Sequence, residues 1–184
     1  MDTKNISKNE GKKEAWEWGK AIGIAVIIAF FTRTLLFSPY LVEGSSMEST
    51  LKNHDKVLVN KAIYLVSKPK HGDVIVLHAT QENDYIKRVI GVPGDKIEVR
   101  DDTLYINDRT VEEKYLSENK NNAAVKPLTE DIRPLVVPEG KVYVLGDNRQ
   151  NSLDSSELGP FDIDKVVGRA EFVLWPFKDI RLIK

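Results

Sequence analysis

Hydroxyl side chains crowd residues 43–51, EGSSMESTL, where Ser46 directly precedes Met47 and further hydroxyls follow at Ser49 and Thr50. A serine hydroxyl is a weak nucleophile until a neighbouring base removes its proton. The stretch has two interpretations, a polar surface loop or the nucleophile segment of a hydrolase. The choice depends on whether the rest of the chain supplies a base.

Histidine is the usual activating base, and the chain contains three, His54, His71 and His78. The first two lie in turn-like contexts, and His78 follows the apolar run VIVL as if at the end of a strand. Aspartates are plentiful, so a Ser-His-Asp arrangement stays open on counting alone.

Lysine is the second candidate base, and Lys87 lies inside the apolar run YIKRVIGV. In a strand, alternation places Lys87 on the face of Tyr85 and Val89 and turns Arg88 to the opposite face. If Lys87 faces the more buried side, desolvation lowers its pKa and leaves a usable neutral amine. The alternative is an edge strand from which both cations reach solvent.

Composition excludes several other classes of chemistry. The chain has 184 residues, a formal net charge of -1 and no cysteine. The absence of cysteine excludes disulfides, thiolate catalysis and cysteine-ligated zinc. The net charge, close to zero, gives no electrostatic reason to expect a nucleic-acid partner. The histidines show no metal-ligand spacing, so we expect no metal site. Nothing in the sequence implies an organic cofactor.

Three segments are expected along the chain: a polar tail over residues 1–14, a membrane anchor helix over 15–38 and an extracytoplasmic catalytic domain over 39–184. The anchor contains AIGIAVIIAFFTRTLLF, residues 21–37, which as a helix spans roughly 25 Å against about 30 Å of hydrocarbon.

Lysines before the apolar run predict a single-pass protein whose N-terminus stays in the cytoplasm and whose catalytic domain lies outside the plasma membrane. Two alternatives are a cleaved secretory signal and a buried helix of a soluble protein. The first lacks a small-x-small site soon after the run, and the second conflicts with its nearly uninterrupted apolar surface.

After Pro39 the pattern changes to short runs rich in valine, isoleucine and aromatic residues, separated by turn residues such as VPGD, RDDT and NDRT. No long amphipathic helix alternates with these runs, which favours antiparallel over parallel pairing. The predicted fold is mainly β, an antiparallel sheet preceded by one transmembrane helix. A small β insert is expected at about 98–137, including a long exposed loop over 117–134.

Four motifs in order resemble those of type I signal peptidases, the membrane-anchored Ser/Lys proteases that remove signal peptides from exported proteins. The nucleophile motif, Ser-Met before x-P-T-L, matches residues 46–51, and the GD-hydrophobic strand matches residues 72–76. The lysine motif K-R-V-I-G-x-P-G-D matches residues 87–95, and G-D-N-R-x-x-S-x-D-S matches residues 146–155. Each motif alone is weak, but the ordered set is specific.

The resemblance implies a nucleophile at Ser46, a general base at Lys87 and a lysine-orienting hydroxyl at Ser152. It also implies an oxyanion site at the Ser46 N–H, because Gly44 stands where some relatives place a serine. Four further positions match the last motif as structural residues: Asp147, Asn148, Arg149 and Asp154.

Three positions depart from the family pattern. Ser49 replaces a proline, His54 replaces a glycine, and Ser156 replaces the arginine that pairs with the aspartate matched by Asp154. Arg149 is the candidate replacement partner of that carboxylate. These departures bear on turnover more than on fold.

The resulting prediction is a monomeric, membrane-bound endopeptidase that cleaves signal peptides of exported preproteins after small-x-small sites, with those peptides and the lipid bilayer as partners. The leading alternative is a catalytically impaired relative that binds precursors without cutting them. A Ser/Lys protease of another purpose and a membrane-anchored β domain without catalysis are weaker alternatives. The exposed or core position of the LWPF run at Trp175 stays open.

Overall fold

The computed structural model describes residues 16–28, 30, 36–80, 83–117, 119 and 127–184, in two compact units, Met1–Phe37 and Ser38–Lys184. In the first unit residues 16–28 are helical and expose their apolar side chains. No helix in the described part of the chain is both long and apolar enough to span a membrane. The predicted tail over 1–14, and residues 15, 29 and 31–35 of the predicted anchor, lie outside the described residues.

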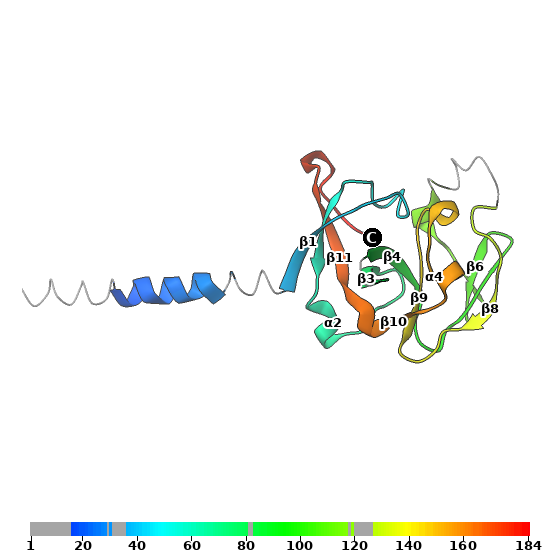
Figure 1. Ribbon diagram of the computed structural model, residues 1–184, viewed down its shortest axis with the longest axis horizontal. Helices are drawn as coiled ribbons and strands as arrows, with labels where there is room; N and C mark the ends of the chain where they lie inside the picture. Colours follow the sequence, from blue (N-terminus) through cyan, green and yellow to red (C-terminus); the bar gives the residue numbers. More distant parts are fainter. Residues whose placement is uncertain (1–15, 29, 31–35, 81–82, 118, 120–126) are drawn as a thin grey trace, which may run out of the picture. The chain divides into compact units, whose positions relative to one another are not determined.

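The second unit is built around one sheet in the order β1-β2-β11-β3-β4-β9-β10, with β12 added beside β11 (Figure 1). The registered pairs β2–β11, β11–β3, β3–β4, β4–β9 and β9–β10 are antiparallel. Its strands are β1 (Phe37–Leu41), β2 (Lys56–Asn60), β3 (Val74–His78), β4 (Asp84–Gly91), β9 (Lys141–Leu145), β10 (Phe161–Asp162), β11 (Val166–Trp175) and β12 (Arg181–Leu182).

A second, four-stranded sheet has the order β7-β6-β5-β8. Its strands are β5 (Lys96–Arg100), β6 (Thr103–Ile106), β7 (Arg109–Val111) and β8 (Ile132–Val136). Both hairpins turn on two residues with positive φ, Asp101 and Asp102 in the first and Asn107 and Asp108 in the second. Aspartate and asparagine tolerate this left-handed conformation, so RDDT and NDRT form tight turns. The predicted fold class, mainly β with an antiparallel sheet and a second small one, is confirmed.

The main sheet is covered on both faces where β3 runs through it. Val74 and Val76 belong to a core cluster with β2 and β11, whereas Ile75 and Leu77 belong to a second cluster with β4 and β9. This explains why VIVL is an uninterrupted apolar run, since strands buried on both faces lose polar alternation. A third cluster joins the small sheet to the ends of β4 and β9.

Helices in this unit are short and connect strands. The named ones are α2 (Ile63–Val66), η1 (Lys114–Leu116), η2 (Arg149–Asn151), α4 (Ser155–Leu158), η3 (Ile163–Lys165) and η4 (Phe177–Asp179). The Asp154 carboxylate caps α4 by accepting from the Ser156 N–H.

His54 replaces the family glycine at a position with a φ of 70°. The left-handed conformation costs a residue with a Cβ roughly 1–2 kcal/mol, and glycine avoids that cost at some loss of chain entropy. We expect His54→Gly to raise the free energy of unfolding by about 0.5–1 kcal/mol, measured by urea denaturation. His78→Gly in β3 is the control and should destabilise; a loss of stability in His54→Gly would contradict the argument.

Candidate active site

The segment that carries Ser46 is an irregular loop between β1 and β2, anchored at both ends. Gly44 adopts a φ of 95° and donates its N–H to Asn53 Oδ1 at 3.0 Å. Met47 and Leu51 are buried in the core cluster that lies on β2 and β11. Ser46 itself, between these anchors, stays partly exposed.

A second segment, residues 146–151, fixes the backbone around the serine. The Asn148 N–H donates to the Ser46 carbonyl at 3.0 Å, and Asn148 Nδ2 donates to the Ser45 carbonyl at 3.1 Å. Asn151 Nδ2 donates to Ser45 Oγ at 2.7 Å. At Gly146 any Cβ would lie 2.5 Å from the Ser46 carbonyl oxygen, so the absence of a side chain there permits the close approach of the two segments.

Lys87 reaches the serine from the middle of β4. Its Nζ donates a hydrogen bond of 2.7 Å to Ser46 Oγ, and the residue is only 3% exposed to solvent. Burial lowers the pKa of Lys87 to about 8, against the opposing effects of Asp154 and Asp147, which raise it. The amine is therefore substantially neutral in mildly alkaline solution and lies within proton-transfer distance of the hydroxyl.

Arg88, next along β4, is also buried, at 1% exposed. The strand lies between β3 and β9 and is not an edge, so the alternative in which both cations reach solvent is wrong. Lys87 Nζ lies 5.3 Å from the Tyr85 ring centroid, which agrees with the predicted shared face. Both faces of this strand are covered, so the sheet buries one cation on each side.

Asp147 neutralises Arg88 through two parallel hydrogen bonds, from Nε to Oδ1 at 2.9 Å and from Nη2 to Oδ2 at 2.7 Å. The Thr50 hydroxyl donates to the same carboxylate and accepts from Arg88. The guanidinium also stacks 3.9 Å from the Tyr115 ring centroid. This ion pair ties the nucleophile segment to β4 behind the dyad.

Ser152 and Asp154 lie together, with Ser152 Oγ donating to Asp154 Oδ2 at 2.6 Å. No hydrogen bond joins Ser152 to Lys87 in the described part of the chain, so the lysine-orienting role stays a prediction. The other Asp154 oxygen accepts from the N–H and the hydroxyl of Ser156 at 3.0 and 2.8 Å. The residue that replaces the family arginine is thus itself a partner of this carboxylate.

Arg149 does not pair with Asp154, which corrects the expectation from sequence. It forms an ion pair with Glu113 in which both side chains are almost fully buried, and it also donates to Thr129 at 3.0 Å. Glu113 lies just after β7 of the small sheet, where no local pattern in the sequence indicates a buried carboxylate. Burial opposes the charge on Arg149, but Glu113 outweighs it, and the pKa of the arginine stays raised.

Asn119 is a further residue that sequence reasoning missed. Its side-chain amide donates to the Glu48 carbonyl and to the Asp147 carbonyl, each at 2.8 Å. Nearby, Ser49 Oγ donates to the Tyr115 carbonyl at 3.0 Å. Where the family proline would stiffen this segment, hydrogen bonds with Tyr115 and Asn119 restrain it instead.

Asn119→Ala removes both bridging hydrogen bonds. We expect the free energy of unfolding to fall by about 1–2 kcal/mol and turnover to drop several-fold, because the nucleophile segment loses a restraint. Urea unfolding and precursor cleavage measure the two effects. Glu112→Ala, an exposed position on the same segment, serves as the control; equal behaviour of the two variants would contradict the restraint.

A cleft of about 570 Å³ opens beside the dyad. Ser46 and Lys87 both line it, together with apolar side chains that include Leu41, Val42 and Ile86. No group of three or more histidine, aspartate or glutamate side chains that could hold a metal ion occurs among the described residues. The geometry thus offers a hydroxyl, a desolvated amine and an adjoining cleft.

Comparisons with known proteins agree on one family. The model of "Signal peptidase, peptidase S26" matches residues 15–175. Signal peptidase I of Bacillus licheniformis is 47% identical over 184 residues, covering 97% of this chain and 98% of the relative. Signal peptidase IB of Staphylococcus aureus is 40% identical, covering 92% and 94%. The crystal structure of a signal peptidase I from Enterococcus faecalis superposes with a TM-score of 0.52 at 38% identity, covering 56% of this chain and 97% of that chain.

Proposed function

Since the chain belongs to the signal peptidase family, peptidase S26, and is a signal peptidase I, a serine endopeptidase, we propose that Ser46 is its nucleophile and Lys87 its general base. The observation that supports this most directly is the 2.7 Å separation of Ser46 Oγ from a buried lysine amine. A hydroxyl paired with a neutral base is the arrangement that acyl transfer requires.

Acylation follows from this geometry. With Lys87 neutral, the hydrogen bond reverses, so that the Ser46 hydroxyl donates to Nζ. As Oγ attacks the scissile carbonyl carbon, its proton passes to Nζ, and the carbonyl electron pair moves onto oxygen. When the tetrahedral intermediate collapses, the C–N bond breaks and the Lys87 ammonium protonates the leaving amine. The signal peptide is left as an ester on Ser46, and the mature chain departs with a free amino group.

The oxyanion of that intermediate needs donors, and we assign the Ser46 N–H to this task. Among the described residues this N–H donates to no protein acceptor, and Ser46 lines the cleft. Gly44 adds no side chain there, so its exposed backbone leaves room for the substrate carbonyl. Hydrolysis of the ester repeats the cycle: Lys87 takes a proton from water, hydroxide adds to the carbonyl, and Ser46 leaves with that proton restored.

We further propose that the substrates have small residues at the first and third positions before the cut. The nucleophile lies only partly exposed beside the buried Met47, and a small side chain next to the scissile carbonyl allows close approach. Mass spectrometry of the two products from one exported precursor locates the bond cut. Replacing the small residue at the first position by phenylalanine should abolish that cut.

The bilayer is the second proposed partner. We propose that residues 15–38 anchor the chain once in the plasma membrane, N-terminus inside, with a monomeric catalytic domain outside. Residues 16–28 are helical and present exposed apolar side chains, which supports an environment other than water. In the catalytic unit Trp175 and Phe177 are 45% and 73% exposed and pack edge to face, so the LWPF run offers aromatic side chains to the headgroup layer.

The proposed base also fixes a pH dependence. A pKa of about 8 for Lys87 means that precursor cleavage should fall about tenfold per pH unit below pH 8 and level off above it, because only the neutral amine accepts the proton. The pH profile of kcat/KM on a precursor peptide measures this midpoint. A midpoint near 6.5 would instead indicate a histidine base.

A further inference from the structure

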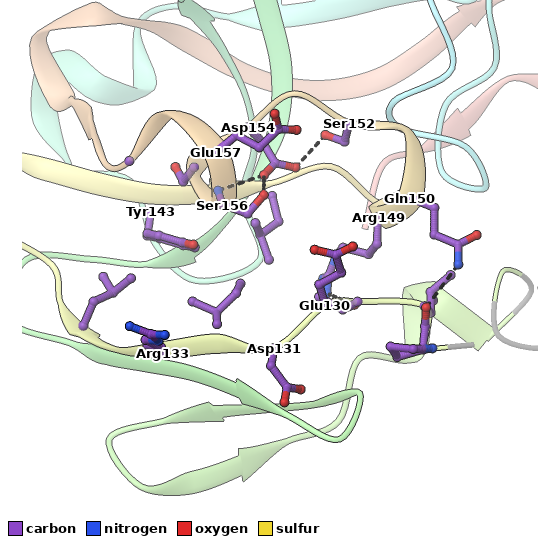
Figure 2. A pocket seen from close by; sticks show the side chains of 18 of the residues that line it. Glu130, Asp131, Arg133, Tyr143, Arg149, Gln150, Ser152, Asp154, Ser156 and Glu157 are labelled. Atoms are coloured by element: carbon purple, nitrogen blue, oxygen red, sulfur yellow. Dashed lines mark hydrogen bonds between the residues drawn. The ribbon is translucent and has the colours of Figure 1, made fainter. Parts of the chain in front are cut away.

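A second cavity, of about 1260 Å³, lies between the segment that leads into β8 and the loop and helix that follow η2. Figure 2 shows Glu130 and Arg133 on one wall and Ser152, Asp154, Ser156 and Glu157 on the other. Its described lining includes neither Ser46 nor Lys87. The cavity is therefore distinct from the substrate cleft, although Asp154 connects it electrostatically to Lys87.

Tyr143, on β9, is 1% exposed and points its hydroxyl into this cavity (Figure 2). That hydroxyl has no hydrogen-bond partner among the described residues. Burial, reinforced by Asp154, raises the pKa of Tyr143, so the group stays a neutral hydroxyl that can donate and accept. No side-chain oxygen of the described residues is both buried and without a partner, so the Tyr143 hydroxyl reaches the solvent that fills the cavity. It is therefore available to a polar group of a ligand at this point.

The charges on the walls favour a cation. Glu130 and Glu157 form no ion pair in the described part of the chain. Asp154 is 1% exposed, and its four hydrogen bonds come only from neutral donors, namely backbone N–H groups and serine hydroxyls. Among the described lining residues these three carboxylates face one cation without an ion pair, Arg133, because Arg149 is neutralised by Glu113.

Asp131 is not counted with these three carboxylates, because its side chain turns away from the other labelled side chains (Figure 2) and accepts from the Asp101 N–H at 3.0 Å. The remaining acceptors lie on opposite walls, with the Tyr143 hydroxyl between them. A flat group with several donors in different directions fits this distribution better than a compact ammonium.

We propose that this cavity is a binding site for a guanidinium group, such as the arginine side chain of a peptide. Its N–H groups would donate to Glu130, Glu157 and the Tyr143 oxygen. A guanidinium is also weakly hydrated, which lowers the cost of entering a partly enclosed space.

The binding test uses the full-length Ser46→Ala protein in detergent micelles, so that no turnover interferes. N-acetyl-arginine amide is titrated calorimetrically, with N-acetyl-citrulline amide as the neutral isostere and N-acetyl-lysine amide as the compact cation. We expect saturable binding of the arginine probe and affinities about tenfold weaker for both other probes. Absence of saturable binding, or equal affinity for any of the other probes, overturns the proposal.

Variants locate the site. The double variant Glu130→Gln/Glu157→Gln should weaken arginine-amide binding about tenfold or more, and Tyr143→Phe several-fold. Glu139→Gln, an exposed acidic position outside the cavity, is the matched control and should bind as before. The two glutamates are exposed, so their amides leave the fold intact; unchanged affinity in the double variant contradicts the assignment.

A second readout rests on the proposed function. Asp154 raises the pKa of Lys87, so a cation bound beside Asp154 should lower it. Saturating arginine amide should then move the midpoint of the pH profile of precursor cleavage to lower pH in the wild type. Binding of arginine amide without that shift overturns only the claim that the site is coupled to Lys87. An absence of cleavage by the wild type counts against the proposed dyad and not against the binding site.

Discussion

Precursor cleavage falls at least about 10⁴-fold when Ser46 is replaced by alanine or Lys87 by methionine, and the double variant is scarcely worse than either single one. The two groups act as one unit: without the hydroxyl nothing is acylated, and without the amine the hydroxyl keeps its proton. Lys87→Arg should fail equally, because a guanidinium stays charged and cannot accept the proton. Product formation in single-turnover assays with an exported precursor measures these losses.

Lys56→Met, on the exposed side of β2, is the control for removing a lysine and should cleave normally. Circular dichroism separates loss of chemistry from loss of fold, since Ser46→Ala removes only one oxygen. Retention of more than a few per cent of activity in Lys87→Met would show that another group takes the serine proton. The pH profile of that residual activity would then identify its class.

The second large effect is on stability, at the Arg88–Asp147 pair. Arg88→Met should lower the free energy of unfolding by about 3–5 kcal/mol, because it leaves the Asp147 carboxylate, 0% exposed, without its cation. Arg88→Met/Asp147→Leu should be less damaging than Arg88→Met, since the double change leaves no uncompensated charge. Urea denaturation followed by tryptophan fluorescence provides the measurement.

The exposed pair Lys96–Asp108 is the matched control for this experiment. Lys96→Met should change stability by less than about 1 kcal/mol, as expected for an ion pair in water. If Arg88→Met costs no more than that control, burial of the pair is not what holds the nucleophile segment to β4. If the double variant is less stable than both Arg88→Met and Lys96→Met, the attraction within the Arg88–Asp147 pair stabilises the fold by more than its desolvation costs.

Much of this architecture follows from local sequence. Local sequence predicts the two hairpin turns from Asp-Asp and Asn-Asp, strand β3 from the uninterrupted run VIVL, and strand β4 from the alternation around Lys87. In each case the physical cause lies within a few residues. The encounter of Ser46 with Lys87 was expected from the ordered motifs and not from either segment alone. Each of these predictions depends only on residue types and their spacing, which can be read directly from the sequence.

What escaped prediction depends on contacts between distant segments. The burial of Arg88 beside Lys87 required β4 to be a central strand, and strand order is not visible in a single strand. The pairing of Arg149 with Glu113, and the bridge from Asn119 to Glu48, depend on how residues between β7 and β8 pack against the nucleophile segment. No periodicity in those residues predicts such a contact.

The hydrogen bonds around the dyad join residues far apart along the chain. Ser46 and Lys87 are separated by 41 positions, Thr50 and Asp147 by 97, and Ser45 and Asn148 by 103. Such contacts pay their loop-closure entropy before they contribute, so they are expected to form late in folding. The residues that complete this environment, Asp147, Asn148 and Asn151, lie in the segment that follows β9. No portion of the domain that ends before that segment therefore contains a complete dyad environment. Proteolytic competence should therefore appear only once the whole domain has assembled, which spares the enzyme's own unfolded chains from a prematurely active serine.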